Sequence, residues 1–274
     1  MKCRHFAALL AAVLAAGGLS GCGRAQAVQG PEATPAPGLL EQIQARGELV
    51  VATEGTWAPW TYHGEDGQLV GYDVEVARLI AGKLGVVATF VEGEFDGLLA
   101  GLETGRYDIM ANGVEITGER GEKYDFSQPY AYIRTAVITR GGDDSIQSLE
   151  DLDGKRTANT ITSTYAALAE QYGAEATGVD DLNQTIELLL AGRVDATLNA
   201  EVTYYDYMAQ HPDADLKIAV LTDQASQVAL PVRKGAETAS FLEAVDQAVE
   251  ELRESGELER LSEQYFGSDL SRER

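Results

Sequence analysis

The stretch LETGRYDIMAN at residues 102–112 is echoed by LLAGRVDATLN at residues 189–199. Both read L-x-x-G-R-x-D-x-x-x-N, and an apolar run at helical spacing precedes each one. The glycine is predicted to end a helix, and the apolar residues between Asp and Asn to form a strand. We interpret the two copies as one unit repeated in two α/β lobes. Asn112 and Asn199 would follow the strands, where open α/β sheets bind ligands, so both lobes would face one cleft.

The residues before the first copy predict a strand–helix–strand unit. LVVA at 49–52 and VVATFV at 86–91 are typical of buried strands, and residues 74–84 between them have apolar side chains at helical spacing. Asp73 is predicted to cap this helix at its N-terminus, and Gly85 to follow its C-terminus. Strand, helix and strand in this order favour a parallel sheet.

The end of the chain predicts two helices, at residues 238–254 and 257–265, separated by Ser255 and Gly256. Four apolar residues of the first helix fall on one face and should form its buried stripe. They are Phe241, Val245, Val249 and Leu252.

The first 22 residues read as an export signal. A basic start is followed by an apolar run, 6–16, that is too short to span a bilayer. LSGC at 19–22 resembles the bacterial lipobox, so we expect acylation of Cys22 and anchoring on the periplasmic or extracellular face of the cell membrane. The alternative is a plain signal peptide in which Cys22 is incidental. Residues 23–38, rich in Pro, Gly and Ala, read as a flexible linker.

The composition limits the partners. There are 44 Asp and Glu residues against 21 Lys and Arg, a formal net charge of −23, which argues against nucleic acid as a partner. Cys3 leaves with the signal, so no disulfide framework is expected. The histidines are scattered, and no H-E-x-x-H, G-x-S-x-G or C-x-x-C motif is present. We therefore expect no metal, no cofactor and no catalytic residues, and a monomeric chain.

Eight short motifs follow one another between residues 53 and 267. They are TEGTWAPW (53–60), GYDVE (71–75), FDGL (95–98), EITGER (115–120), DFSQPY (125–130), GRVD (192–195), RKG (233–235) and YFG (265–267). In this order they resemble the family 3 extracellular solute-binding proteins of amino-acid ABC importers. The sequence near Asn112 and at residues 160–165 is most similar to that of polar amino-acid and cystine-type binding proteins.

The resemblance implies a type II periplasmic-binding-protein fold, in which parallel-type α/β sheets flanked by helices form two lobes joined by two crossover strands. Lobe one would be 39–134 plus 231–274, and lobe two 135–230. The implied function is to bind a polar amino acid, cystine being one candidate, by hinge closure and to deliver it to the membrane subunits of an ABC importer.

The candidate site follows from ligand chemistry and from family positions. Arg120 would hold the ligand carboxylate through a bidentate guanidinium, and Trp57 and Phe95 would form aromatic walls. The other candidates are Asn112, Gly113, Asn199 and the turn of Thr162, Ser163 and Thr164, whose N–H groups and hydroxyls could hold the carboxylate from lobe two. The structural alternatives are a surface arginine, core aromatics and simple helix capping; Trp60 we interpret as structural.

Two positions depart from the family pattern. Ala200 stands where many members have an aspartate for the ligand ammonium, and Glu115 stands where many have Ser or Thr. Our hypothesis is that Glu115 takes over the ammonium. Alternatively, Glu115 binds a basic side chain of the ligand or is exposed to solvent. Glu54 or Glu201 would then hold the ligand ammonium.

Two other classes of protein remain as alternatives. Some members of this fold class are enzymes, such as cyclohexadienyl dehydratases or lytic glycosidases, and the Glu54–Glu115 pair could in principle perform acid–base chemistry. A ligand-sensing receptor domain would require a membrane helix and a signalling module. We expect a binding protein rather than either of these.

Overall fold

The structure, a computed structural model, describes residues 36–273. The predicted signal peptide, the predicted acylation site Cys22 and most of the predicted linker lie outside these residues. Of the described residues, 37–273 belong to one compact unit. Within the described range, no helix is long and apolar enough to cross a membrane.

The first lobe is built on a parallel sheet whose central strand is β1 (Glu48–Thr53). Strand β5 (Val87–Glu92) lies on one side of β1 and β6 (Ile109–Met110) on the other, both parallel to it. Helix α2 (Tyr72–Lys83) connects β1 to β5, and Gly85 follows it with φ 77°. The predicted strand–helix–strand unit is therefore confirmed.

Asp73 is not the cap of α2, so that prediction is wrong. The helix begins two residues earlier than predicted, at Tyr72, and its N-cap is Gly71. Gly71 has a φ of 132° and no room for a side chain, because a Cβ would lie 2.2 Å from the Trp60 carbonyl oxygen. Asp73 is instead fully buried, and its carboxylate accepts hydrogen bonds from the Tyr130 hydroxyl and the Gly113 N–H.

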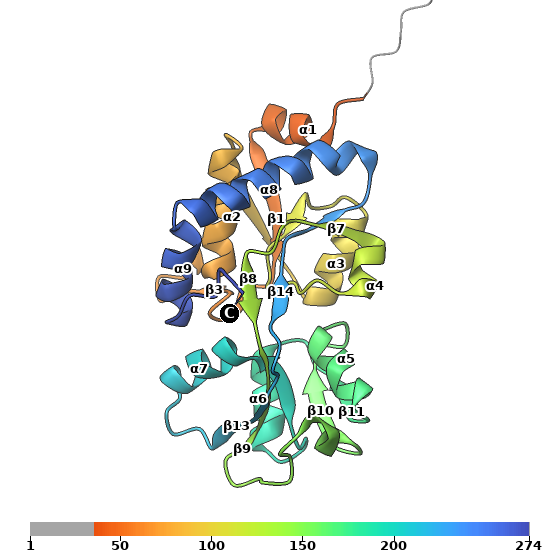
Figure 1. The fold of residues 1–274 in the computed structure, drawn as a ribbon, viewed down its shortest axis with the longest axis vertical. Coiled ribbons are helices and arrows are strands. Elements are labelled where there is room, and N and C mark those ends of the chain that lie inside the picture. The colour runs from red at the N-terminus through yellow and green to blue at the C-terminus, as the bar shows by residue number, and fades with distance from the viewer. Residues whose placement is uncertain (1–35, 274) are drawn as a thin grey trace, which may run out of the picture. The chain divides into compact units, whose positions relative to one another are not determined.

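Further elements complete this lobe (Figure 1). They are α1 (Leu39–Arg46), a small antiparallel sheet of β2 (Thr56–Trp57), β3 (Thr61–His63) and β4 (Leu69–Val70), α3 (Phe95–Glu103) and α4 (Gly118–Lys123). The chain returns to it through α8 (Ala239–Glu254) and α9 (Glu257–Phe266), which confirms the two predicted terminal helices. All four residues of the predicted stripe on α8 are buried.

The second lobe holds two sheets. Strand β9 (Thr135–Arg140) pairs antiparallel with both β12 (Thr197–Ala200) and β13 (Leu216–Leu221). Strands β10 (Arg156–Asn159) and β11 (Glu175–Gly178) run parallel. The helices are α5 (Thr164–Gln171), α6 (Leu182–Leu190) and α7 (Glu201–Gln210), with short 3₁₀ turns at Leu149–Leu152 and, in the first lobe, at Ala236–Thr238. The antiparallel pairing of β9 was not predicted.

Two antiparallel strand pairs join the outgoing and returning chain. Strand β7 (Tyr124–Phe126) pairs with β15 (Pro231–Arg233), and β8 (Ala131–Ile133) pairs with β14 (Ser226–Val228). Figure 1 shows β8 and β14 side by side between the two lobes. The chain therefore crosses between the lobes in both directions along one narrow path.

The repeated sequence unit is a repeated structural unit. Gly105 (φ 74°) follows α3 and Gly192 (φ 68°) follows α6, and each donates its N–H to the leucine carbonyl three residues before it. Equivalent apolar residues pack into a separate core in each copy: Leu99, Leu102 and Tyr107 in one, Ile186, Leu189 and Val194 in the other.

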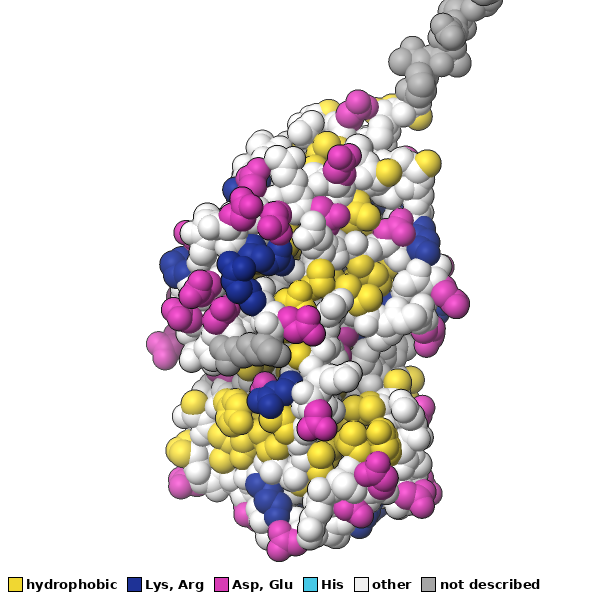
Figure 2. Space-filling model, in the orientation of Figure 1, with side chains coloured by type: hydrophobic (Ala, Val, Ile, Leu, Met, Phe, Trp, Pro, Cys, Tyr) yellow, Lys and Arg dark blue, Asp and Glu magenta, His cyan; other side chains and the backbone are white. Residues whose placement is uncertain are grey.

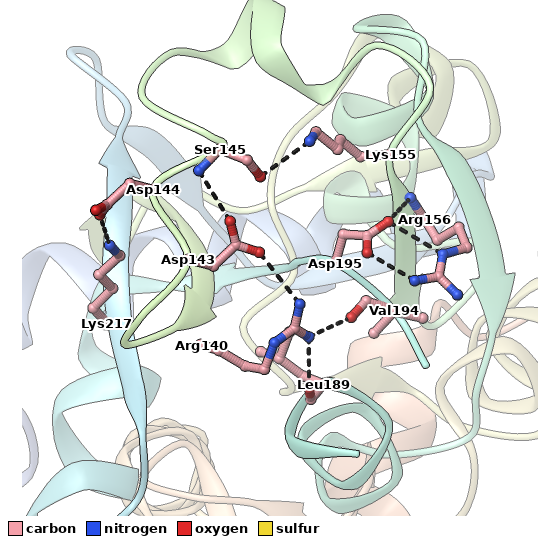
Figure 3. Close-up of polar contacts among 10 residues, drawn as sticks. All are labelled: Arg140, Asp143, Asp144, Ser145, Lys155, Arg156, Leu189, Val194, Asp195 and Lys217. Carbon is pink, nitrogen blue, oxygen red and sulfur yellow. Dashed lines mark hydrogen bonds and ion pairs between the residues drawn. The ribbon is translucent and has the colours of Figure 1, made fainter. Parts of the chain in front are cut away.

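The aspartates of the two copies also make the same kind of hydrogen bond to a strand. Asp108 accepts the N–H of Val50 in β1, and Asp195 accepts the N–H of Arg156 in β10, at 2.7 and 2.9 Å. Figure 3 shows the second copy, where the Arg156 guanidinium also donates to Asp195 and where Arg140 donates to the carbonyl oxygens of Leu189 and Val194. The aspartate thus ties each loop to a neighbouring strand.

The acidic balance of the sequence is visible on the surface. In the view of Figure 2, Asp and Glu side chains are spread over both lobes, with fewer Lys and Arg side chains among them. A dispersed acidic surface of this kind favours solubility.

Candidate functional site

A pocket lies where the loops of the two lobes meet. It encloses about 590 Å³ of space, part of it open to solvent. Ten of the eleven ligand-binding candidates line it: Glu54, Trp57, Phe95, Asn112, Gly113, Glu115, Arg120, Ser163, Thr164 and Asn199. Asn112 follows β6 as predicted, whereas Asn199 lies within β12 rather than beyond it. The two lobes do face one cleft.

Arg120 is a buried arginine in the short helix α4. Thr117 caps this helix by accepting the Arg120 N–H, which fixes where the side chain leaves the backbone. The guanidinium donates to the carbonyl oxygens of Glu115 and Thr162, each at 3.0 Å, and lies over the Phe95 ring at 5.4 Å from its centroid. Burial lowers the pKa of Arg120, and the nearby Glu115 partly opposes this. Its charge is therefore held in a largely dry site.

Aromatic rings form one wall. Trp57 stacks on Trp60 with 5.4 Å between ring centroids; Trp60 is fully buried and lies outside the lining residues, so it serves as support. Gly113 lies close to both rings: its φ is 56°, and a Cβ there would lie 2.5 Å from the Trp57 ring and 3.5 Å from the Trp60 ring. The absence of a side chain at Gly113 therefore lets the Trp57 ring lie against the backbone.

Glu54 leaves the carboxyl end of β1 and is held by Asn112. The Asn112 amide accepts the Glu54 N–H at 2.7 Å and donates to the Glu54 carboxylate at 2.6 Å. Burial raises the pKa of Glu54 to about 7, with Asp181 and Asp96 adding to the rise and the Asn112 hydrogen bond opposing it. Asn112 thus positions an acidic group that gains or loses a proton near neutral pH.

Glu115 is 5% exposed, so the alternative in which it faces solvent is wrong. The Thr164 hydroxyl, from the second lobe, donates to its carboxylate, and its backbone bridges to Val228 in β14. Ala200, the other departure from the family pattern, is fully buried and presents only a methyl group. The acidic group that could bind a ligand ammonium here is therefore Glu115 of the first lobe, and not a residue at position 200 of the second lobe.

The turn before α5 supplies the facing wall. Ser163 caps the helix by accepting the Ala166 N–H, which confirms the capping interpretation without excluding a second role. Thr162 lies outside this pocket: its hydroxyl donates to Asp96, and its carbonyl accepts from Arg120. Its neighbours Ser163 and Thr164 both line the pocket.

Glu201, one alternative for the ammonium, lies elsewhere. Its carboxylate forms a bidentate pair with the Arg134 guanidinium, at 2.8 and 3.2 Å, next to the crossing from β8 to β9. It does not line the pocket. A carboxylate already neutralised by arginine is a poor partner for a ligand cation, so this alternative loses its basis.

Sequence reasoning missed seven lining residues: Thr56, Asn159, Thr160, Tyr165, Asp181, Leu182 and Thr185. Asp181 could have been found from the internal repeat. It caps α6 as Glu94 precedes α3, and the two positions are separated by the same 87 residues as the two L-x-x-G-R-x-D stretches. The repeat therefore predicts that the start of α6, like the start of α3, lies at the cleft.

Comparison with known proteins agrees with this fold. Residues 49–268 match the family described as bacterial extracellular solute-binding proteins, family 3. The chain belongs to this family. Membership implies an exported protein that acts in the periplasm or outside the cell.

Individual relatives cover nearly the whole chain. A probable amino-acid ABC transporter-binding protein of Haemophilus influenzae is 37% identical over 85% of this chain and 90% of its own length. The L-cystine-binding protein TcyA of Bacillus subtilis is 36% identical over 95% of this chain and 96% of its own length. An ancestral arginine-binding protein solved with arginine is 36% identical, with a TM-score of 0.75, and covers 81% of this chain and 99% of its own.

Proposed function

We propose that this protein captures one polar amino acid in the pocket around Arg120 and delivers it to the membrane subunits of an ABC importer. The observation that carries the proposal is the buried Arg120 guanidinium. Among residues 36–273 no carboxylate forms an ion pair with it within 4.0 Å, yet it lines a pocket with aromatic walls. An ionised group in such a site favours a ligand that brings the opposite charge.

Glu115 is our candidate for the ligand ammonium. In an α-amino acid the carboxylate and ammonium are bonded to the same carbon, so their partners must lie close together. Arg120 donates to the backbone of Glu115, which places both residues at one end of the pocket. Glu54 is held by Asn112 and shares the pocket with Asp181, so we assign it to the ligand side chain.

Capture would proceed by closure of two lobes, 39–134 plus 231–274 and 135–230. Two segments connect the lobes, Arg134–Arg140 and Ser226–Pro231, and both would act as hinges. The antiparallel pairing of β8 with β14 supports this division, because it confines the connections to one path. Binding by closure, with no chemical step, is the proposed role. The chain would act as a monomer.

A thermal-shift screen of the full chain against the twenty amino acids and cystine tests the proposal. A ligand that binds the folded state raises the melting temperature. We expect one amino acid, or a small group, to do so, and Arg120→Ala to abolish the shift. Arg193→Ala, at an exposed arginine outside the pocket, is the matched control. If no amino acid stabilises the chain, the proposed function is wrong.

The acylated Cys22 completes the proposal, since a lipid anchor would keep the protein beside its importer. A Cys22→Ser variant should leave the membrane fraction for the soluble fraction, with its ligand-induced melting shift unchanged. A variant that stays in the membrane fraction would contradict the lipid anchor but not the proposed capture of an amino acid.

A further inference from the structure

The acidic and basic groups of the pocket are unequal in number. Among the described lining residues there are three carboxylates, Glu54, Glu115 and Asp181, and one cation, Arg120. A single guanidinium provides for one ligand carboxylate, and a single acidic group provides for one α-ammonium. Two carboxylates therefore remain for the rest of the ligand.

These two carboxylates line the same pocket from opposite lobes. Glu54 extends from the end of β1, and Asp181 from the start of α6. Burial is the main cause that raises the pKa of Glu54, and repulsion from the negative charge of Asp181 adds to the rise. Neither forms an ion pair within the described part of the chain. A cation placed between them would relieve this repulsion.

Asn159 provides an independent indication that a hydrogen-bond donor binds there. It is 4% exposed and lines the pocket; its amide nitrogen donates to the Thr197 hydroxyl and the Leu198 carbonyl. Its amide oxygen has no partner among the described residues. Asn159 pairs with Gly178 at the end of β11, three residues before Asp181, so this acceptor lies on the Asp181 side. A buried acceptor without a partner favours a ligand N–H.

We propose that Glu54, Asp181 and the Asn159 amide oxygen form a subsite for a cationic side chain, so that the preferred ligand is an amino acid with a second basic group, an amine or a guanidinium. This inference rests on the proposed function and specifies its substrate class. Asp181 is the residue through which the second lobe distinguishes a cationic from a neutral side chain. Cystine also brings a second ammonium but fits less well, because the carboxylate on the same carbon would lie near Glu54 and Asp181, and the described lining residues offer no second cation to pair with it.

Isothermal titration calorimetry of the full chain tests this subsite with L-lysine, L-arginine, L-glutamine and L-cystine. We expect lysine or arginine to bind at least roughly tenfold more tightly than glutamine or cystine. In Asp181→Asn this preference over glutamine should shrink by roughly tenfold, as expected for loss of one partly buried charge. Asparagine retains the oxygen that caps α6 by accepting the Gln184 N–H, so the helix should be preserved.

Asp180→Asn, at the exposed neighbour that does not line the pocket, is the matched control and should leave the preference unchanged. Glutamine or cystine binding as tightly as the basic amino acids would overturn the subsite while leaving amino-acid capture intact. An unchanged preference in a folded Asp181→Asn variant would overturn the role of Asp181. If none of the amino acids binds, both this inference and the proposed function fail.

Discussion

At the scale of single residues, the pocket-lining side chains are held in position by hydrogen bonds from neighbouring residues. Asn112 holds Glu54, and Thr117 sets the position of Arg120 by capping its helix. Asp73 accepts the Gly113 N–H from behind, at the residue that lies against Trp57. Affinity should therefore depend on buried residues that the ligand does not contact.

Glu54 gives a pH dependence whose direction is defined. Its pKa is raised to about 7, and the groups facing it are Asn112, Asp181 and Asp96. A cationic side chain binds the deprotonated carboxylate, so affinity for lysine or arginine should rise with pH through 7 and level off above 8. Calorimetric titrations from pH 5.5 to 8.5 would measure this.

Two controls separate Glu54 from other titrating groups, including Asp73, whose pKa burial also raises to about 7. Glutamine, with its neutral side chain, should show a flatter profile across the same pH range. Glu54→Gln should flatten the profile for the basic ligand. An equally steep profile in that variant would assign the dependence to another group.

At the scale of elements, the sequence predicted units whose signals are local. The helix–glycine–strand repeat and the strand–helix–strand unit depend on spacing and on glycines with positive φ, and both are present. The antiparallel course of β9 could not be read, because strand direction depends on pairing partners far away in the chain. The cap of α2 was misassigned because an aspartate near a helix start is read as a cap unless its buried partners are known.

Gly71 provides the element-scale prediction. Gly71→Ala would place a Cβ 2.2 Å from the Trp60 carbonyl oxygen at a φ of 132°, so the entry to α2 must shift. We expect a loss of about 2–4 kcal/mol in the free energy of unfolding, measured by urea denaturation.

Gly82→Ala in the same helix is the control for that substitution. Its Cβ would meet no atom within 4 Å, and alanine favours helix, so stability should be unchanged or rise by about 0.5–1 kcal/mol. Equal effects of the two substitutions would show that the close approach at Gly71 does not constrain the fold.

At the scale of the whole molecule, the sequence predicted the two lobes and most lining residues, since family motifs and repeat positions lie at the cleft. It could not predict contacts between the lobes, because they join residues distant in the chain. Thr162 shows the difference: it was expected to contact the ligand, yet its hydroxyl donates to Asp96 across the cleft. We infer that this contact favours closure of the lobes.

Asp96→Asn tests the effect of that contact. Both side chains are exposed, so weakening this hydrogen bond should cost about 0.5–1 kcal/mol and lower ligand affinity by roughly twofold to fivefold, mainly through faster ligand release. Stopped-flow fluorescence of Trp57 and Trp60 would follow the release rate. Glu94→Gln, at an exposed residue two positions away, should leave it unchanged. An unchanged rate of ligand release in Asp96→Asn would show that this contact does not favour closure, which would then depend on the ligand and the hinges alone.

The central claim is that Arg120 and Glu115 together hold the backbone of an amino acid between the lobes. A crystal structure of the protein with the amino acid that most raises its melting temperature tests this most directly. The account predicts the ligand carboxylate on the Arg120 guanidinium, the α-ammonium on Glu115 and the side chain directed toward Glu54 and Asp181. A ligand bound with its carboxylate away from Arg120, or outside this pocket, would contradict it.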